Sequence, residues 1–211
     1  MAQRNYVSNK DESARLFESD FLELFTHVHW SVPLIVFLPV VSYFLYQASL
    51  NPLIGSWSIL LLFVAGVLVW TFTEYILHRF VFHYEPKSTI GKRLHFLLHG
   101  IHHDYPNDSL RLVMPPIVSG PLAAIFYFLF LVLLGSTMVP AFFAGFIVGY
   151  LFYDMIHYAT HHAPLKGKTG QRLKHHHMRH HYQTMHYNYG VSSPLWDFVF
   201  RTYQEKKELA A

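Results

Sequence analysis

Apolar residues occur in four long stretches, and polar regions rich in histidine lie between and after them. Each stretch is about 20 residues long, the length of an α-helix that crosses a bilayer. Pro33 and Pro39 lie inside the first stretch, where we expect them to kink a helix without ending it. The pattern therefore predicts four transmembrane helices, at about 31–50, 56–78, 116–136 and 139–158.

The polar regions predict the remainder of an all-α integral membrane fold. Residues 79–115 and 159–211 are expected to form a histidine-rich helical cap, with a short helix in KSTIGKRLHFLLHGIHH. Residues 1–12 are expected to be a disordered tail, followed by a membrane-interface helix with Ser13 as its N-cap. The apolar stripe of that helix comprises Leu16, Phe17, Phe21, Leu24 and Phe25. We thus expect an N-terminal tail and interfacial helix over 1–30 and a single membrane domain over 31–211.

Composition agrees with a membrane protein. Hydrophobic residues make up 52% of the chain and charged residues only 14%, against about 25% charged residues in soluble domains. The chain has no cysteine, so cysteine-ligated iron–sulfur clusters, haem-thiolate and disulfides are excluded. The basic pI is better explained by positive charge beside a membrane than by binding of nucleic acid. We therefore expect no nucleic-acid partner.

The distribution of positive charge predicts the orientation. All 16 Lys and Arg residues lie in the N-terminal segment, in 79–111 or from Lys166 onward, and the loops near 51–56 and 136–139 contain none. By the positive-inside rule, both termini and the cap are cytoplasmic, beneath the endoplasmic reticulum membrane or a bacterial inner membrane. The sequon at Asn107 would then lie on the wrong side for glycosylation.

Ten histidines form four groups at the ends of the apolar stretches. Two groups have the spacing H-x-x-H-H, which on a helix places all three imidazoles on one face. Because one ion takes only four to six ligands, ten histidines predict two metal ions. The alternative is a solvated tract that binds metal non-specifically. The groups are His78 and His83; His99, His102 and His103; His157 and His161; and His177, His180 and His181.

The position of these groups narrows the chemistry. A structural zinc site needs only four ligands, and a transporter needs polar ligands near the middle of the bilayer. A hydrolase would have a nucleophile or a carboxylate base beside the metal. By elimination, the pattern favours oxygen chemistry on a membrane lipid, and a histidine-rich metal-binding or transport protein is the alternative.

Four segments resemble the fatty acid hydroxylase/sterol desaturase superfamily, and most closely its fatty acid 2-hydroxylase branch. They are TEYILHRFVFH, LHFLLHGIHHDYPNDSLRLVMPP, YDMIHYATHH and KHHHMRHHYQTMHYNYGVSSPLWDFVF. The resemblance implies a membrane di-iron oxygenase that uses O2 and external electrons to hydroxylate C2 of a long fatty acyl chain. It also implies that the ten histidines are the metal ligands. Relatives acting on sterols, carotenoids or alkanes are the alternative within the superfamily.

Other residues near the histidines have predicted supporting roles. Tyr153 and Asp154 form the pair that the family places near its site, and they are the candidate catalytic residues. Some residues are candidates for orienting the histidine ligands through hydrogen bonds without binding metal themselves. The stronger candidates are Glu74, His95 and His162, and the weaker ones are Asp104, Asp108 and Asp197. We expect Arg111 to form a loop salt bridge and Trp196 to pack. Five histidines are expected to be interfacial or surface residues and not ligands: His27, His29, His175, His176 and His186.

Cofactor and partners follow from the resemblance. Iron is the expected metal, although zinc also binds imidazole well. The HPGG motif of a fused cytochrome b5 domain is absent from this sequence, which predicts a separate electron donor of the ferredoxin or cytochrome b5 type. Lys166, Lys168, Arg172, Lys174 and Arg179 would suit docking of an acidic donor, or else contact with anionic lipid. Free fatty acid, acyl-CoA and ceramide are equally compatible substrates.

Overall fold

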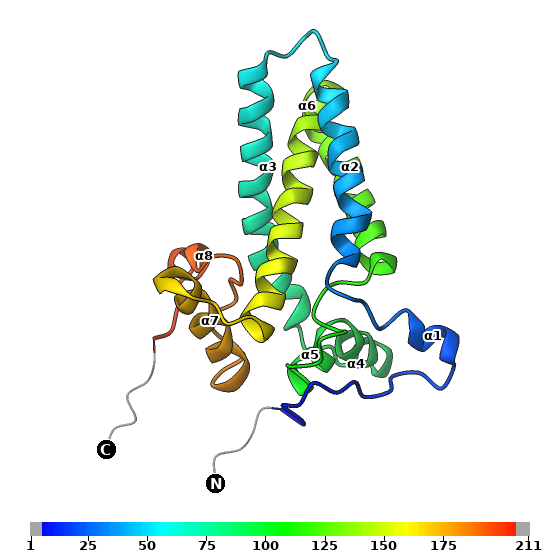
Figure 1. Ribbon diagram of the computed structural model, residues 1–211, viewed down its shortest axis with the longest axis vertical. Helices are drawn as coiled ribbons and strands as arrows, with labels where there is room; N and C mark the ends of the chain where they lie inside the picture. The colour runs from blue at the N-terminus through cyan, green and yellow to red at the C-terminus, as the bar shows by residue number, and fades with distance from the viewer. Residues whose placement is uncertain (1–5, 206–211) are drawn as a thin grey trace.

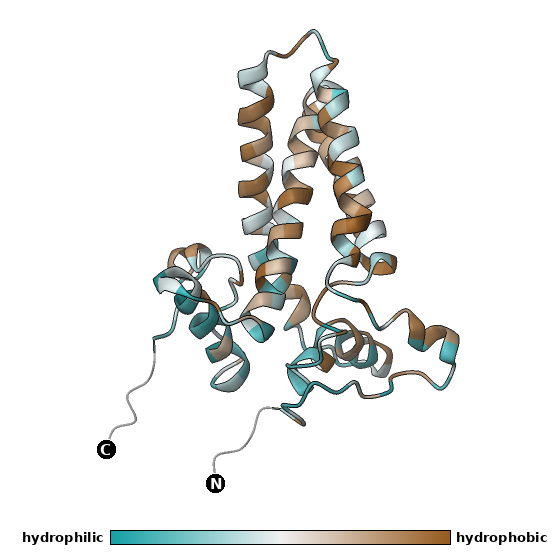
Figure 2. Cartoon of the chain, in the orientation of Figure 1, coloured by the Kyte–Doolittle hydropathy of each residue, from teal (hydrophilic) through white to brown (hydrophobic). Residues whose placement is uncertain are grey.

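A computed structural model describes residues 6–205 and contains helices but no strands within them. Three long helices, α2 (Val32–Ser49), α3 (Ser56–Ile76) and α6 (Pro116–His162), form an elongated bundle, and short helices gather at one end of it (Figure 1). Apolar residues dominate the bundle, whereas the cap is largely hydrophilic (Figure 2). All three long helices are apolar and long enough to cross a membrane.

The third long helix reverses direction within its 47 residues. Run straight, it would measure about 70 Å, more than twice the apolar thickness of a bilayer. Gly135 breaks it with φ 74° and ψ 165°, a left-handed region that glycine adopts at little cost. The two halves then pack side by side, with the rings of Phe130 and Phe142 4.9 Å apart. In place of the predicted loop at 136–139, the chain reverses its direction at Gly135.

Small residues allow the bundle helices to approach closely. A Cβ on Gly66 of α3 would lie 2.0 Å from the carbonyl oxygen of Phe142 in α6, and one on Gly145 would lie 1.9 Å from that of Phe63. A third close approach places Gly149 against Trp70. Backbone contact of this kind is how helices associate where the surrounding lipid is as apolar as the side chains.

The cap is built from short helices on both sides of α6. One part continues α3 as the π-helix η1 (Leu77–Phe82) and then forms α4 (Thr89–His95), the π-helix η2 (Phe96–Gly100) and α5 (Ile101–Asp104). The other part contains α7 (Gly167–Tyr182) and α8 (Leu195–Val199). The helix predicted in KSTIGKRLHFLLHGIHH is confirmed, and Ser88 caps it by accepting a hydrogen bond from the Gly91 N–H at 3.1 Å.

The N-terminal segment differs from the prediction. Its helix, α1, covers only Asp20–Leu24, and Ser13 donates a hydrogen bond to Asp108 instead of capping a helix. The backbone N–H groups of Leu16 and Phe17 donate to Glu23, which holds this stretch out of helical conformation. The described part of the predicted disordered tail is also ordered, since Val7 donates to the Asp104 carbonyl at 2.9 Å. Residues 1–5 lie outside the described range.

Candidate metal centre

The ten predicted histidines lie in two clusters of five. In each cluster, one ring nitrogen from every residue lies within 4.8 Å of the others. We call the clusters site A and site B. Site A comprises His78, His83, His99, His103 and His180, and site B comprises His102, His157, His161, His177 and His181.

Each H-x-x-H-H motif is divided between the two sites. The outer histidines of the first motif, His99 and His103, belong to site A, and the middle one, His102, belongs to site B. The second motif is divided the opposite way, with His180 in site A and its two companions in site B. Helices η2–α5 and α7 therefore both run past both sites, and the rings of His103 and His181 stack 4.3 Å apart between them.

A π-helix brings together the pair in HRFVFH. Residues five apart on an α-helix are rotated by about 140° from each other about the helix axis, so their side chains cannot reach the same metal ion. Over Leu77–Phe82 the chain widens to a π-helix, and the His83 N–H donates to the His78 carbonyl at 3.2 Å. The Nε2 atoms of His78 and His83 consequently lie 3.3 Å apart. Such turns are frequently found at functional sites.

The electrostatics of the clusters suit a cation. Burial lowers the pKa of the six histidines of the two H-x-x-H-H motifs, and the neighbouring histidines lower it further. The pKa of His103, for example, falls to about 3. At neutral pH these imidazoles are uncharged, which is the form that binds metal. Converging Nε2 pairs lie 2.9 Å apart in His83 and His180 and in His102 and His157. The donor set therefore fits one metal ion in each site.

An apolar cavity of about 700 Å³ opens onto these clusters. Three of the clustered histidines, His99, His102 and His157, line it together with Tyr153 and Asp154. The Tyr153 ring stacks on that of His157 with centroids 5.8 Å apart. Apart from Thr26 and Arg111, the other lining side chains are apolar, and most come from the N-terminal segment, η1, η2 and the first half of α6, including Phe17, Phe25, Leu77, Leu97, Val118 and Leu122.

The other predicted neighbours of the ligands lie in different places. Glu74 accepts hydrogen bonds from the backbone of Val191 and Ser192, at 2.7 and 2.9 Å, and in the described structure it has none with a histidine. His95 is half-buried at the end of α4, and His162 stacks on Tyr158 with centroids 4.9 Å apart. Both residues lie outside the two clusters.

One histidine assigned to the surface is buried. His176 is only 3% exposed and pairs with Asp197, Nε2 to Oδ2, at 3.0 Å, whereas His175 and His186 are exposed as predicted. The partner lies in a separate helix, so the histidine run alone gave no sign of this pair.

Two loop and packing predictions are confirmed. The buried Arg111 guanidinium lies 2.7 Å from a Glu23 oxygen and 3.4 Å from an Asp108 oxygen. This ion pair ties the N-terminal segment to the loop before α6. Trp196 packs against Phe72 and donates from Nε1 to Thr71 at 3.1 Å.

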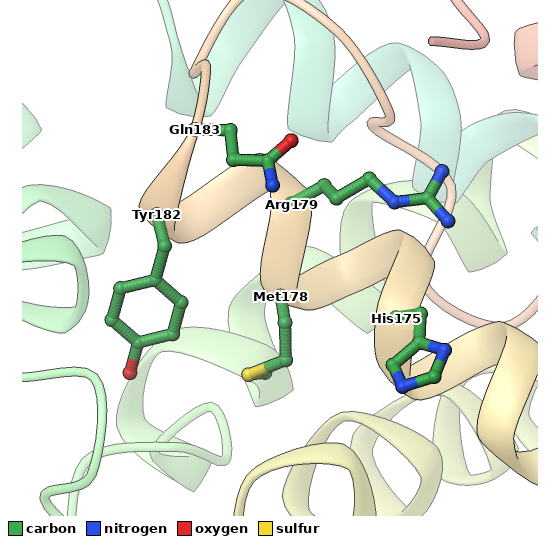
Figure 3. Close-up of a pocket in the computed structure, with 5 residues that line it drawn as sticks. All are labelled: His175, Met178, Arg179, Tyr182 and Gln183. Atoms are coloured by element: carbon green, nitrogen blue, oxygen red, sulfur yellow. The ribbon is translucent and has the colours of Figure 1, made fainter. Parts of the chain in front are cut away.

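The outer face of α7 is open. Figure 3 shows His175, Met178, Arg179, Tyr182 and Gln183 lining a shallow hollow there, of about 400 Å³. The candidate ligands His177, His180 and His181 lie on the buried side of the same helix. The hollow and these histidines therefore lie on opposite sides of α7.

Comparisons with known proteins agree with this architecture. Residues 63–202 match a family model described as fatty acid hydroxylase. A dihydroceramide fatty acyl 2-hydroxylase of Arabidopsis thaliana is 43% identical over 90% of this chain and 80% of its own length. A fatty acid 2-hydroxylase of Mus musculus is 39% identical over 89% of this chain but only 56% of its own length.

A solved structure shows the same fold. It is that of full-length Scs7p, in which only the hydroxylase domain is visible. It superimposes with a TM-score of 0.84 at 43% identity, over 88% of this chain and 70% of that one. The resemblance seen in the sequence is confirmed, and this chain belongs to the fatty acid hydroxylase family.

Proposed function

We propose that this protein hydroxylates C2 of a long fatty acyl chain, using O2 and electrons from outside. The observation that carries the proposal is the apolar cavity, which His99, His102 and His157 of the two clusters line. A cavity of this kind accepts a lipid chain and excludes water from the reacting carbon. The choice of C2 is supported by the relatives, which are named fatty acyl 2-hydroxylases.

Sites A and B are proposed to hold two metal ions, with the ten histidines as ligands. Iron is our assignment for the active enzyme, and a zinc-loaded preparation is compatible with the same imidazole ligands. When bound, a redox-active pair supplies the activation of O2. The chain's own part is to keep the imidazoles neutral and their Nε2 atoms converging.

Tyr153 and Asp154 are proposed to act on the substrate where the cavity meets site B. Both side chains line the cavity, and Asp154 lies one helical turn before His157. Neighbouring methylenes differ little in reactivity, so selection of C2 requires that the polar end of the acyl group be anchored. A phenol that donates and a carboxylate that accepts hydrogen bonds are suited to anchoring it.

Four membrane crossings with a cytoplasmic metal centre are the topology we propose. The reversal at Gly135 supplies two crossings from α6, and the cap carries the positive charge at one end of the bundle. Of the described residues, α1 and its neighbours in the N-terminal segment would lie along the interface, and residues 31–205 would form one membrane domain. The apolar side chains of Phe21 and Leu24 in α1 are more than half exposed, which suits that interface.

Substituting Leu122 with tryptophan tests the cavity. The larger ring would fill part of the acyl channel, so the longest 2-hydroxy chains are expected to fall by about tenfold relative to shorter ones. Gas chromatography–mass spectrometry of acyl chains from expressing cells measures both hydroxyl position and chain length. Val132→Trp is the matched control, because Val132 is on the same helix but 84% exposed and outside the cavity.

Two outcomes would contradict the proposal in different ways. Wild-type cells that bind metal and contain a reductant, yet make no 2-hydroxy chains, would refute the assigned reaction. An unchanged chain-length profile in Leu122→Trp would show that the acyl chain lies elsewhere.

We further propose that an acidic redox protein docks on the outer face of α7. The segment 166–183 contains five Lys and Arg residues and no Asp or Glu. Lys168 and Arg172 are exposed on it. Because α7 bears ligands of both sites on its buried side, a donor bound there would lie one helix away from the metals.

Reversing the charge of Lys168 and Arg172 to glutamate tests this docking surface. The KM for an acidic ferredoxin or cytochrome b5 is expected to rise on the order of tenfold, with a weaker dependence on salt. Turnover driven by a small chemical reductant should not change. Lys92→Glu with Arg93→Glu, an exposed basic pair in α4, is the matched control. Equal effects of both double variants would overturn the assignment to α7.

A further inference from the structure

Two buried carboxylates hold four consecutive backbone N–H groups after α7. Asp197 accepts from Tyr189 and from Gly190, each at 2.8 Å. Glu74, in α3, accepts from Val191 at 2.7 Å and from Ser192 at 2.9 Å. Hydrogen bonds from buried N–H groups to a carboxylate are among the stronger ones in proteins. Residues 189–192 are thereby attached to both α3 and α8.

This segment and the residues just before it, together 187–192, orient two proposed ligands of site A. The Nδ1 of His78 bonds to the carbonyl of Tyr189, and the Nδ1 of His180 bonds to the carbonyl of Tyr187 at 2.8 Å. Because a carbonyl only accepts, each Nδ1 carries the proton and each Nε2 keeps its lone pair. Both lone pairs are then available to the metal in site A.

Asp197 is placed to support this arrangement and not to bind metal itself. It is completely buried, and it also accepts from Thr202 at 2.8 Å and pairs with His176 at 3.0 Å. Four donors therefore occupy its two oxygens. Asn188 completes the turn in the left-handed region, with φ 61°, and its N–H donates to the Thr202 carbonyl at 2.9 Å.

Site B has no comparable support among residues 6–205. The buried Nδ1 atoms of His102, His161, His177 and His181 have no hydrogen-bond partner there. In site A the Nδ1 of His103 has none either, so the difference between the sites lies in His78 and His180. Hydrogen bonds to the second ring nitrogen fix the tautomer and the orientation of a ligand, and losing them lowers metal affinity by about 10- to 100-fold. The two sites thus differ in how firmly their ligands are held.

We propose that Asp197, through the Tyr187–Ser192 backbone, is a positioning residue for site A and makes the two metal sites unequal. Glu74 holds the other half of the same segment. This inference rests on the proposed metal pair and adds to it that site A retains its ion more firmly than site B.

Single-site backgrounds separate the two affinities. His161→Ala combined with His157→Ala removes two of the five histidines of site B and leaves site A complete, and His83→Ala combined with His99→Ala does the reverse. These double variants are called the His161→Ala and His83→Ala backgrounds. In detergent-purified full-length protein, zinc affinity is measured by competition with a chelator. Adding Asp197→Asn to the His161→Ala background is expected to weaken zinc binding by about 10- to 100-fold. Added to the His83→Ala background, it should leave zinc affinity unchanged.

A spectroscopic measurement distinguishes positioning from general support of the fold. Cobalt in site A is expected to change its visible absorption spectrum in Asp197→Asn, whereas cobalt in site B should not. Equal losses of affinity at both sites, or none at site A, would overturn the proposal. If Asp197→Asn does not fold, Glu74→Gln tests the same segment from α3, with the same expected selectivity for site A. Failure of both parent backgrounds to bind zinc would instead refute the metal pair itself.

Discussion

Replacing His180 with alanine is expected to abolish formation of 2-hydroxy acyl chains. His180 is completely buried, and its Nε2 lies 2.9 Å from that of His83 within site A. Loss of residues that only support a metal ligand costs about 10- to 100-fold, so loss of the ligand itself should lower activity by at least about 100-fold. Acyl analysis by gas chromatography–mass spectrometry, together with the metal content of the purified protein, measures the effect.

His186→Ala is the control for this substitution. His186 is an exposed histidine in the segment after α7 and belongs to neither site. Its replacement should leave both product and metal content at wild-type levels. Hydroxylation that persists in His180→Ala with two bound metals would remove His180 from the ligand set.

A single methyl group at Gly145 is expected to prevent correct packing of the membrane bundle. The new Cβ would lie 1.9 Å from the Phe63 carbonyl oxygen, and neither backbone can move without separating α3 from α6. Overpacking of cores costs typically 1–3 kcal/mol, so a clash with backbone should cost about 3 kcal/mol or more. That is a large part of the about 5–15 kcal/mol that stabilises a typical domain. Thermal unfolding in detergent, followed by size-exclusion chromatography, measures the loss.

Gly120→Ala provides the comparison within the same helix. A Cβ there meets no atom within 4 Å, so thermal stability should match or slightly exceed that of the wild type. If Gly145→Ala were as stable as Gly120→Ala, the close approach of α3 and α6 would not be needed for folding.

The sequence predicted the features that depend on local pattern. Apolar stretches of bilayer length identified the helices of the bundle, because hydrophobicity along the chain is sufficient for that purpose. The four histidine groups could also be recognised from the sequence, because the members of each group lie close together along the chain. Their number indicated two metal ions, and the structure brings the ten residues into two groups of five.

Features that depend on distant contacts were not predictable from local pattern. The π-helix between His78 and His83 changes the rotation per residue, which no spacing rule for an α-helix includes. His176 looked like one more surface histidine because its partner, Asp197, is 21 residues away. The N-terminal segment has a helical pattern, yet Glu23 and Arg111 draw its polar groups into tertiary contacts.

The distribution of ligands along the chain sets an order for biosynthesis. Site A takes residues from His78 to His180, and site B from His102 to His181. Neither site has its full set until the ribosome has passed the end of α7, after the bundle helices have been translated. In the proposed enzyme, metal loading is therefore a late step, and a chain truncated before α7 would reach the membrane without a complete metal-binding site.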